Sequence, residues 1–160
     1  MADSEGVAKE IEYKFLLSGM PEIHKLADRC SSYTIHHGWL PGKVIKERIS
    51  KISRSGGELW RAIKAGKGLE RIEAQEQINQ KLFDVFWPLT EGKRVYKLRY
   101  VVDDPTGVWE IDSFSDRTLF LAELEVPSVD TKIKIPKWLK PYIKKDITMD
   151  SKYKNVNLAM

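Results

Sequence analysis

Hydrophobic and polar residues alternate with a period of two along most of this sequence. In residues 10–17 (EIEYKFLL), Glu10, Glu12 and Lys14 stand at every second position, with apolar and aromatic residues between them. On a β-strand this places the charged side chains on one face and the apolar ones on the other. The same period predicts eight strands, near residues 8–17, 32–40, 43–54, 58–65, 70–78, 94–102, 107–114 and 119–127.

Turn sequences and short helical patterns separate these strands. RSGGE (54–58) and DDPTG (103–107) have the turn residues of hairpins. Asn79 is suited to cap one helix, and Pro141 limits another to a turn or two. The predicted helical segments are residues 20–30, 79–89 and 135–145.

These elements predict one domain over residues 1–160 with a mainly β (α+β) fold. No internal repeat or interdomain linker is visible in the sequence. Eight mostly antiparallel strands favour a closed barrel with a few short flanking helices, because closure removes exposed strand edges.

Charged residues of one sign recur in pairs on the polar strand faces. The pairs are Glu10 and Glu12, Lys97 and Arg99, Glu110 and Asp112, and Glu123 and Glu125. Alternate residues of a strand lie about 6.6 Å apart, so two such carboxylates can converge on one ion. Like charges about 4 Å apart repel by about 4 kcal/mol at an effective dielectric of about 20. A single strand of this kind is more often a solvated outer face, but the repetition favours a polar interior that binds a divalent cation and a polyanion.

Composition narrows the chemistry of that interior. The net charge of +4 is a modest indication of an anionic partner. A single cysteine excludes an internal disulfide and fits a reducing cytoplasm, and the three histidines form no zinc pattern with it. A hard cation held by carboxylates, Mg²⁺ or Mn²⁺, remains. No apolar run approaches the roughly 20 residues of a membrane span. Without a Walker A motif, side chains would hold the phosphates while water attacks a phosphoanhydride.

The motifs resemble the CYTH superfamily, also called triphosphate tunnel metalloenzymes. Glu10, Glu12 and Lys14 form a Glu-x-Glu-x-Lys signature in the first strand. Further matching segments follow in order: HHGWLPG, ERISK, AIKAGKG, RIEAQ, VYKLRY, VWEIDSF, LAELEVPS and DSKYKNVNLA. The resemblance implies an eight-stranded antiparallel tunnel that holds a triphosphate group and divalent cations. Members of the superfamily include inorganic, thiamine and RNA triphosphatases and one class of adenylate cyclases.

The resemblance also implies roles for individual residues. The metal-side carboxylates would be Glu10, Glu12, Asp112, Glu123, Glu125 and Glu73, with Glu110 a weaker candidate. The phosphate-binding cations would be Lys14, Arg48, Lys64, Lys97 and Arg99, with Arg71 as a further helper. The catalytic set would be Glu10, Glu12, Lys14 and Asp112.

The sequence departs from the family pattern at three positions. Ser50 stands where the second arginine of an Arg-x-Arg pair is common, and Gln75 stands where the second glutamate of a Glu-x-Glu pair is common. His37 stands before Gly38, where a glutamine is typical. Ser50 removes one positive charge and Gln75 one negative charge, so we expect a preserved charge balance and a weakened catalytic rate.

These observations predict a cytoplasmic hydrolase that uses Mg²⁺ or Mn²⁺ on a linear triphosphate, with inorganic triphosphate as the first choice. One alternative, motivated by Ser50 and Gln75, is a tunnel that binds polyphosphate or nucleotides without catalysis. Another is an adenylate cyclase or an organic triphosphatase of the same fold. Nucleic-acid binding by the C-terminal lysines is disfavoured, because no array of stacking aromatics accompanies them. Assembly as a homodimer is left open.

Overall fold

The computed structural model describes residues 5–159, so both ends of the predicted domain (residues 1–4 and 160) lie outside the description. The strands are β1 (Gly6–Leu17), β2 (Cys30–Trp39), β3 (Glu47–Ile52), β4 (Glu58–Ala65), β5 (Glu70–Gln77), β6 (Arg94–Asp104), β7 (Gly107–Phe114), β8 (Phe120–Glu125) and β9 (Ile143–Asp146). The α-helices are α1 (Gln80–Phe86) and α2 (Asn155–Leu158). Five 3₁₀ segments accompany them within the described range: η1 (Ile23–Arg29), η2 (Arg54–Gly56), η3 (Trp87–Thr90), η4 (Lys140–Tyr142) and η5 (Ser151–Tyr153).

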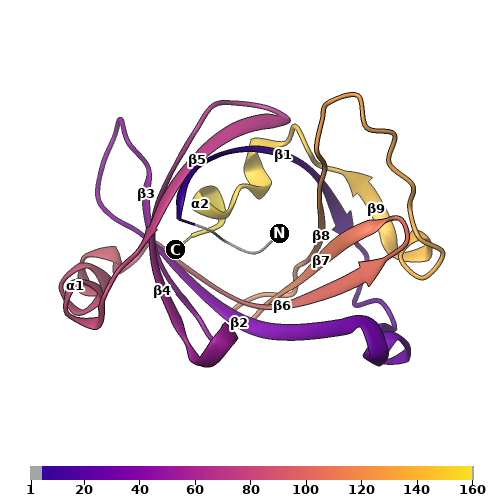
Figure 1. Cartoon of the computed structure of the whole chain (residues 1–160), viewed down its shortest axis with the longest axis horizontal. Coiled ribbons are helices and arrows are strands. Elements are labelled where there is room, and N and C mark those ends of the chain that lie inside the picture. Colours follow the sequence, from indigo (N-terminus) through magenta and orange to yellow (C-terminus); the bar gives the residue numbers. More distant parts are fainter. Residues whose placement is uncertain (1–4, 160) are drawn as a thin grey trace.

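The strands form one antiparallel sheet that closes on itself (Figure 1). Their order is β5-β4-β3-β2-β6-β7-β8-β1-β9, and an additional pairing of β1 with β5 completes the ring. β1 makes this closure because it is long: residues 6–11 pair with β5, and residues 12–16 pair with β8. The predicted eight-stranded barrel is confirmed, and β9 is an additional strand. Residues 143–145 belong to β9 and not to the helical segment predicted over 135–145, in which only Lys140–Tyr142 (η4) is helical.

The two turn sequences form the predicted connections. Thr106 donates its backbone N–H to the side chain of Asp104 at 3.0 Å, which tightens the turn between β6 and β7. Gly107 follows with φ of 136°, and a Cβ at this position would lie 2.8 Å from the Leu124 side chain. This position therefore requires glycine for both its backbone conformation and its close contact.

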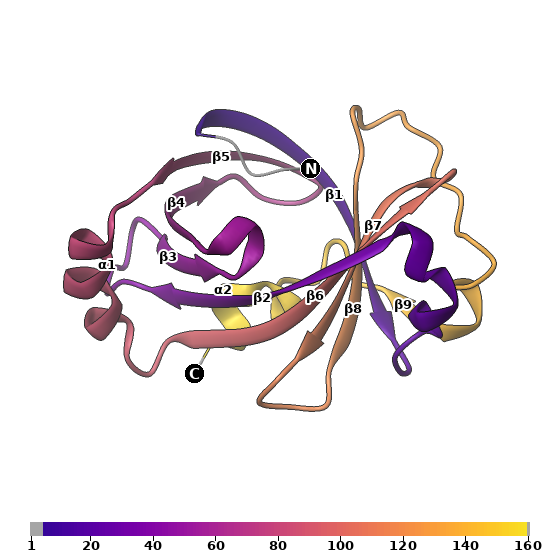
Figure 2. The ribbon, with the colours of Figure 1, turned by 60° about the horizontal axis from the view of Figure 1, so that its bottom comes forward.

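Several predicted boundaries change in the structure. The third strand begins at Glu47 and not near residue 43, because the chain turns first and Lys46 donates to the Gly42 carbonyl at 3.2 Å. Asn79 caps α1 as predicted, accepting from the Leu82 N–H at 3.0 Å. The segment predicted over 20–30 is a 3₁₀ helix and not an α-helix, with Leu26 outside helical geometry. α1 and η1 lie at opposite ends of the molecule (Figure 2).

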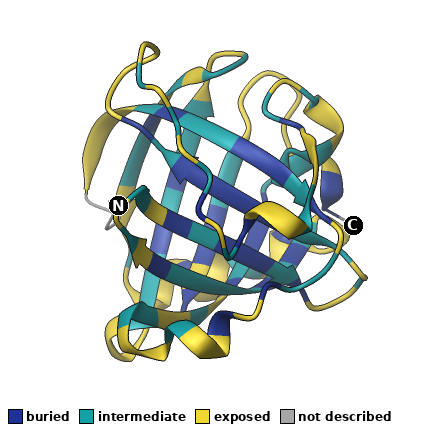
Figure 3. Ribbon diagram, turned by 90° about the vertical axis from the view of Figure 1, so that its right-hand side faces the viewer, coloured by how far each residue is buried: buried dark blue, intermediate teal, exposed yellow. Residues whose placement is uncertain are grey.

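The largest hydrophobic cluster lies on the outer face of the barrel. Trp109 and Ile111 of β7 are fully buried there against Leu124 of β8 and Phe15 of β1. η1 and the segment before β9 cover this face, and Leu139 from that segment is also fully buried. Buried and more exposed residues alternate along the strands (Figure 3). The apolar faces therefore point outward beneath a cover, and the charged faces point into the barrel.

A second cluster closes part of the barrel interior. Trp39, Val95, Phe114 and Leu121 point inward from four strands and meet apolar residues that follow β9, which are Ile147, Leu158 and Ala159. α2 consequently lies inside the ring of strands in projection (Figure 1). The C-terminal part of the described chain thus forms part of the wall around the interior.

Candidate functional site

The barrel encloses a cavity of about 250 Å³ whose lining is mostly charged. All strands from β1 to β8 contribute to it, together with Lys154 and Asn155 at the start of α2. Among the described residues, the charged lining comprises Glu10, Glu12, Lys14, Lys46, Arg48, Lys64, Arg71, Glu73, Lys97, Arg99, Glu110, Glu123, Glu125 and Lys154. The period-two pattern has therefore placed acids and bases from distant parts of the sequence in one enclosed space.

All but one of the site residues predicted from the sequence line this cavity. The exception is Asp112, which is fully buried and lies behind the lining. The cavity residues with predicted roles are Glu10, Glu12, Lys14, Arg48, Lys64, Glu73, Lys97, Arg99, Glu123 and Glu125. Their convergence supports the prediction of a common site, while the role of each remains a prediction.

Acidic side chains concentrate where β1, β7 and β8 lie side by side. Glu12 pairs in register with Glu125 across β1 and β8, and Glu123 pairs with Glu110 across β8 and β7. Burial raises the pKa of Glu125, and the nearby carboxylates of Glu10 and Glu12 raise it further. Burial also raises the pKa of Glu110, to about 7. This wall concentrates negative charge, which favours a bound cation.

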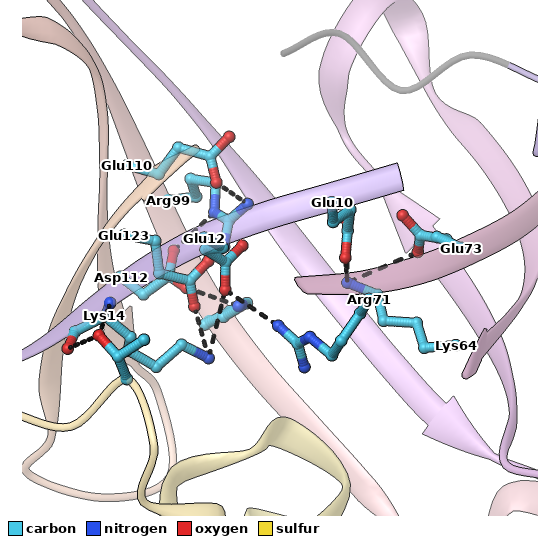
Figure 4. Close-up of polar contacts among 12 residues, drawn as sticks. Glu10, Glu12, Lys14, Lys64, Arg71, Glu73, Arg99, Glu110, Asp112 and Glu123 are labelled. Carbon is cyan, nitrogen blue, oxygen red and sulfur yellow. Dashed lines mark hydrogen bonds and ion pairs between the residues drawn. The ribbon is translucent and has the colours of Figure 1, made fainter. Parts of the chain in front are cut away.

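Cationic side chains reach these acids from neighbouring strands (Figure 4). The Nζ atom of Lys64 lies 3.0 Å from Oε2 of Glu10 and 3.7 Å from Oε1 of Glu73. The Nη2 atom of Arg48 lies 3.0 Å from the same Glu73 oxygen. These ion pairs compensate the carboxylates in the protein without a ligand.

A second network surrounds Asp112. The Nζ atom of Lys97 lies 2.5 Å from Oδ2 of Asp112, and Nε of Arg99 lies 2.7 Å from Oδ1. Arg99 also contacts Glu123 at 2.9 Å, and Lys14 lies 3.0 Å from Glu123. Burial alone would raise the pKa of Asp112, but Arg99 and Lys97 outweigh it and hold the pKa below its usual value. Asp112 therefore stays ionised and orients two cations of the cavity wall.

Four buried polar atoms of cavity residues have no hydrogen-bond partner among residues 5–159. They are Nε of Arg48, Nε of Arg71, Oδ1 of Asn155 and Oε1 of Glu123, the last of which is ion-paired with Lys14 at 3.0 Å. A buried polar group without a partner is destabilising by roughly 1–3 kcal/mol, so such groups in native proteins call for a ligand, an ion or water. The two free guanidinium donors fit an anionic ligand.

Two of the three departures from the family pattern are neighbours, and the third lies elsewhere in the barrel. Ser50 is buried and lies 2.7 Å from Nδ1 of His37, its register partner on β2. Gln75 stands at the closing seam of the barrel, between Ala62 of β4 and Gly6 of β1. His37 lines the cavity, whereas Ser50 and Gln75 are not among its lining residues. Across the strands, Ser50 is in register with Trp60 and Gln77, whereas Gln75 is in register with Ala62. Ser50 and Gln75 are therefore not in register with each other.

Sequence reasoning missed Lys154 and Asn155 as site residues. They lie at the start of α2, a short helix with no alternating pattern, so the strand argument could not place them. DSKYKNVNLA contributed to the family resemblance, which was the one signal that could have identified them. Arg71 and Glu110, treated as weaker candidates, both line the cavity.

The chemistry of the acidic wall suits a hard cation, although a complete cation site is not preassembled. Carboxylate oxygens are the ligands that Mg²⁺ and Mn²⁺ prefer. Within the described residues, no three acidic, histidine or cysteine side chains are arranged to hold a metal ion. Glu10 is instead paired with Lys64, and Glu12 lies 3.4 Å from Arg71. The donors fit such an ion once those pairs open.

The described helices are all too short or too polar to cross a bilayer. The fold and cavity define a class of protein: a closed antiparallel tunnel whose interior is built from ion pairs and suited to a polyanion and a cation.

No family model matches this chain. An inorganic triphosphatase of Nitrosomonas europaea is 35% identical over 157 residues, which are 94% of this chain and 97% of that protein. An inorganic triphosphatase of Acetivibrio thermocellus is 28% identical over 157 residues, 96% of this chain and 94% of that protein. The crystal structure of the inorganic triphosphatase NE1496 aligns with a TM-score of 0.65 and 30% identity, covering 94% of this chain and 93% of that one. The chain belongs to the CYTH superfamily of triphosphate tunnel proteins, as a member of its inorganic triphosphatase family.

Proposed function

We propose that this protein hydrolyses inorganic triphosphate to pyrophosphate and phosphate with the help of Mg²⁺ or Mn²⁺. The observation that carries the proposal is the cavity in which cationic and acidic side chains form two compensating sets. The relatives at 35% and 28% identity, both inorganic triphosphatases, support the same activity. Reaction of one triphosphate with one water breaks a phosphoanhydride bond and forms the two products.

The cationic set would bind the phosphates. Arg48 and Lys64 are paired with carboxylates that line the cavity, and a triphosphate would displace those carboxylates as it enters. Lys97 and Arg99 would contact the phosphates while Asp112 continues to hold them from behind. Charge-assisted hydrogen bonds to phosphate are stronger than neutral ones, so the exchange is favourable for several donors together. The unpartnered Nε atoms of Arg48 and Arg71 add donors that are not used in the protein without a ligand.

The acidic set would then hold the metal. Glu10 and Glu12 would lose Lys64 and Arg71 to the phosphates, and their oxygens would then be available for Mg²⁺ or Mn²⁺, with Glu125, Glu123 and Glu73 as further candidates in the cavity lining. When bound, the ion would neutralise phosphate charge and polarise a phosphoryl oxygen. Lys14 lies 3.0 Å from Glu123 and 3.8 Å from Glu12, where it can both orient an acidic ligand and contact a phosphate.

Asp112 would act as a positioning residue for the reaction. Both of its oxygens accept hydrogen bonds from Lys97 and Arg99, and these two cations line the cavity in front of it. Fixing these cations before the ligand arrives reduces the reorganisation that binding requires. The predicted role of Asp112 as a metal ligand therefore receives less support than its role in holding the cationic wall.

A phosphate-release panel tests the proposed activity. Triphosphate, pyrophosphate, ATP, GTP and thiamine triphosphate are each incubated with Mg²⁺, with Mn²⁺ and with a chelator. We expect the fastest release from inorganic triphosphate and none with the chelator. Tight triphosphate binding without turnover would indicate a binding tunnel, and formation of cyclic AMP from ATP would indicate a cyclase.

A further inference from the structure

A histidine–serine pair lies in the cavity wall beside the ion pairs. Nδ1 of His37 on β2 lies 2.7 Å from Oγ of Ser50 on β3, and the two residues are 5% and 1% exposed. His37 lines the cavity, whereas Ser50 is not among the lining residues. Because Ser50 occupies Nδ1, Nε2 is the ring nitrogen left for a ligand. Ser50 therefore orients the imidazole ring, and His37 is the member of the pair that can contact a ligand in the cavity.

The surroundings of His37 keep its ring neutral in the protein without a ligand. Burial lowers the pKa of His37 well below its usual value, and four cations on three other strands lower it further. These are Arg48 on β3, Lys64 on β4, and Lys97 and Arg99 on β6. The edge of the ring also packs against Trp39 at a centroid distance of 5.9 Å. No carboxylate is among these main influences, so the electrostatic field at His37 depends on cations assigned to phosphate binding.

We propose that His37 contacts the bound triphosphate through Nε2 and takes up a proton from solvent as the ligand enters. The inference rests on the triphosphate site proposed above. A polyanion among the four cations would cancel their repulsion of the imidazolium and place phosphate oxygens near the ring, and both effects favour the charged form. The bound site then gains one cation that is absent from the free protein.

The serine hydroxyl is suited to both protonation states. A hydroxyl can donate a hydrogen bond to an unprotonated Nδ1 and can accept one from the N–H of an imidazolium. An arginine at position 50, as in the Arg-x-Arg pattern, has only donors and could not accept from the charged ring. Ser50 thus gives up a permanent positive charge, and His37 supplies one only when a polyanion is bound.

A defined pH dependence of binding follows. If the His37 pKa is higher in the complex than in the free protein, triphosphate affinity rises as pH falls through the bound-state value and levels off below the free-state value. Between those two values the gain approaches tenfold per pH unit, since one proton is taken up per ligand. Triphosphate itself also titrates, so the contribution of His37 is the difference between wild type and His37→Gln.

Calorimetry of triphosphate binding measures this proton directly. Titrations in a chelator without divalent metal, in two buffers of different ionisation enthalpy, give proton uptake without turnover. Near pH 7, we expect wild type to take up more protons per bound triphosphate than His37→Gln, with a difference of up to about one proton. His37→Gln should weaken binding roughly tenfold near pH 6 and little near pH 8.5. His36→Gln, a change on the neighbouring half-exposed histidine beside Tyr96, is the matched control.

Two serine variants test the positioning role of Ser50. Ser50→Ala removes the acceptor for the charged ring, so proton uptake should fall toward the level of His37→Gln. Ser50→Thr keeps the hydroxyl and should restore uptake. A purely structural role of the pair would change thermal stability in these variants without changing proton uptake.

Ring signals of the three histidines in wild type give a readout that needs no substitution in the site. His36→Gln and His24→Gln assign the two other histidines, and the remaining signal is that of His37. With triphosphate bound near pH 6, we expect the His37 signal to report an imidazolium. A neutral ring in the complex, or equal proton uptake in wild type and His37→Gln, would overturn the inference and leave the proposed hydrolysis intact. Absence of both triphosphate binding and phosphate release in wild type would overturn both.

Discussion

The two faces of the same strands have different physical roles. On β7, Trp109 and Ile111 point outward and are fully buried beneath a cover of loops and 3₁₀ turns, whereas Glu110 and Asp112 point inward. The outer face gains its stability from removing apolar surface from water. The inner face holds paired charges whose desolvation offsets much of their attraction. We infer that stability resides mainly outside the barrel and ligand binding inside it, one residue apart along the chain.

The inner acidic wall should give the largest effect on activity. Glu125→Gln removes one charge from the proposed metal-binding oxygens while leaving a side chain of nearly the same shape. We expect phosphate release from triphosphate to fall by roughly a hundredfold or more, with an unchanged urea midpoint. Glu70→Gln, a change on an exposed residue paired with Lys9, should retain wild-type activity. Full activity of Glu125→Gln at limiting metal would remove Glu125 from the metal site.

A core substitution on the outer face should show the opposite pattern. Ile111→Ala creates a cavity at a fully buried position and should lower the free energy of unfolding by about 2–5 kcal/mol. Activity per folded molecule should stay near wild type, because the side chain points away from the cavity. Urea unfolding and phosphate release at low temperature measure the two quantities. A large loss of turnover without loss of stability would mean that the two faces cannot be separated in this way.

The inner cations should control affinity. Arg48 is a charged partner of Glu73, and its Nε has no hydrogen-bond partner among the described residues. Arg48→Gln removes this cation and leaves Lys64 near Glu73. We expect the dissociation constant of triphosphate to rise about tenfold, since a charge-assisted bond contributes about 1.5–3 kcal/mol, and binding to become less sensitive to salt. Calorimetry measures both. An equal loss for the exposed Lys137→Gln would instead assign binding to the outer basic surface.

The shared ion pairs predict that metal and triphosphate bind cooperatively. Each ligand alone leaves opposite charges without partners, whereas both together satisfy the two sets. We expect Mg²⁺ to lower the dissociation constant of triphosphate, and to lower it less in Arg48→Gln than in wild type. Triphosphate should increase the affinity for Mg²⁺ by the same factor as Mg²⁺ increases the affinity for triphosphate. Stopped-flow mixing measures both factors by following binding before the triphosphate is hydrolysed. Independent binding would show that the ion pairs persist in the complex.

The last expected effect concerns stability and not activity, and it is a pH dependence at Glu110. Its pKa is raised by burial to about 7, so the folded state holds this proton more tightly than the unfolded chain does. Its contribution to stability is present at acidic pH and is lost as the pH rises toward about 7. The side chain of Glu110→Gln does not ionise, so the variant avoids this loss. As the pH rises from about 4.5 to about 7, its free energy of unfolding should increase relative to that of wild type by on the order of 1–3 kcal/mol. Urea midpoints of the two proteins across that range measure it, and parallel curves would contradict it.

Alternation in the sequence was sufficient for the barrel but not for every element in it. Strand β9 escaped prediction because its four residues, IKKD, carry no alternation and follow a proline turn. It is held by backbone pairing with Phe15 and Leu16, which any side chains would permit. The direction of the charged faces required more than periodicity, since alternation alone is equally compatible with a solvated exterior. Same-sign pairs such as Glu123 and Glu125 supplied that information.

The cavity lining was predictable as a set of residues, whereas their roles in a functional site stay predictions. The depth of Asp112 behind the lining depends on barrel curvature, which the pattern does not contain. Lys154 and Asn155 reach the cavity from the start of the short helix α2, outside the alternating strands. His37 and Ser50 were visible as separate departures, and only strand register shows that they are partners.

The double pairing of β1 has a consequence for folding kinetics. This first strand completes the ring by joining β5 along one half and β8 along the other, so that Glu12 pairs with Glu125, a residue far from it in the sequence. Such non-local contacts form late, because the entropy of closing long loops must be overcome before they contribute. Since β1 also carries Glu10, Glu12 and Lys14, a partly folded chain with an unclosed ring would have most of its sheet and no complete cavity. Recovery of triphosphate binding during refolding should therefore follow the final kinetic phase.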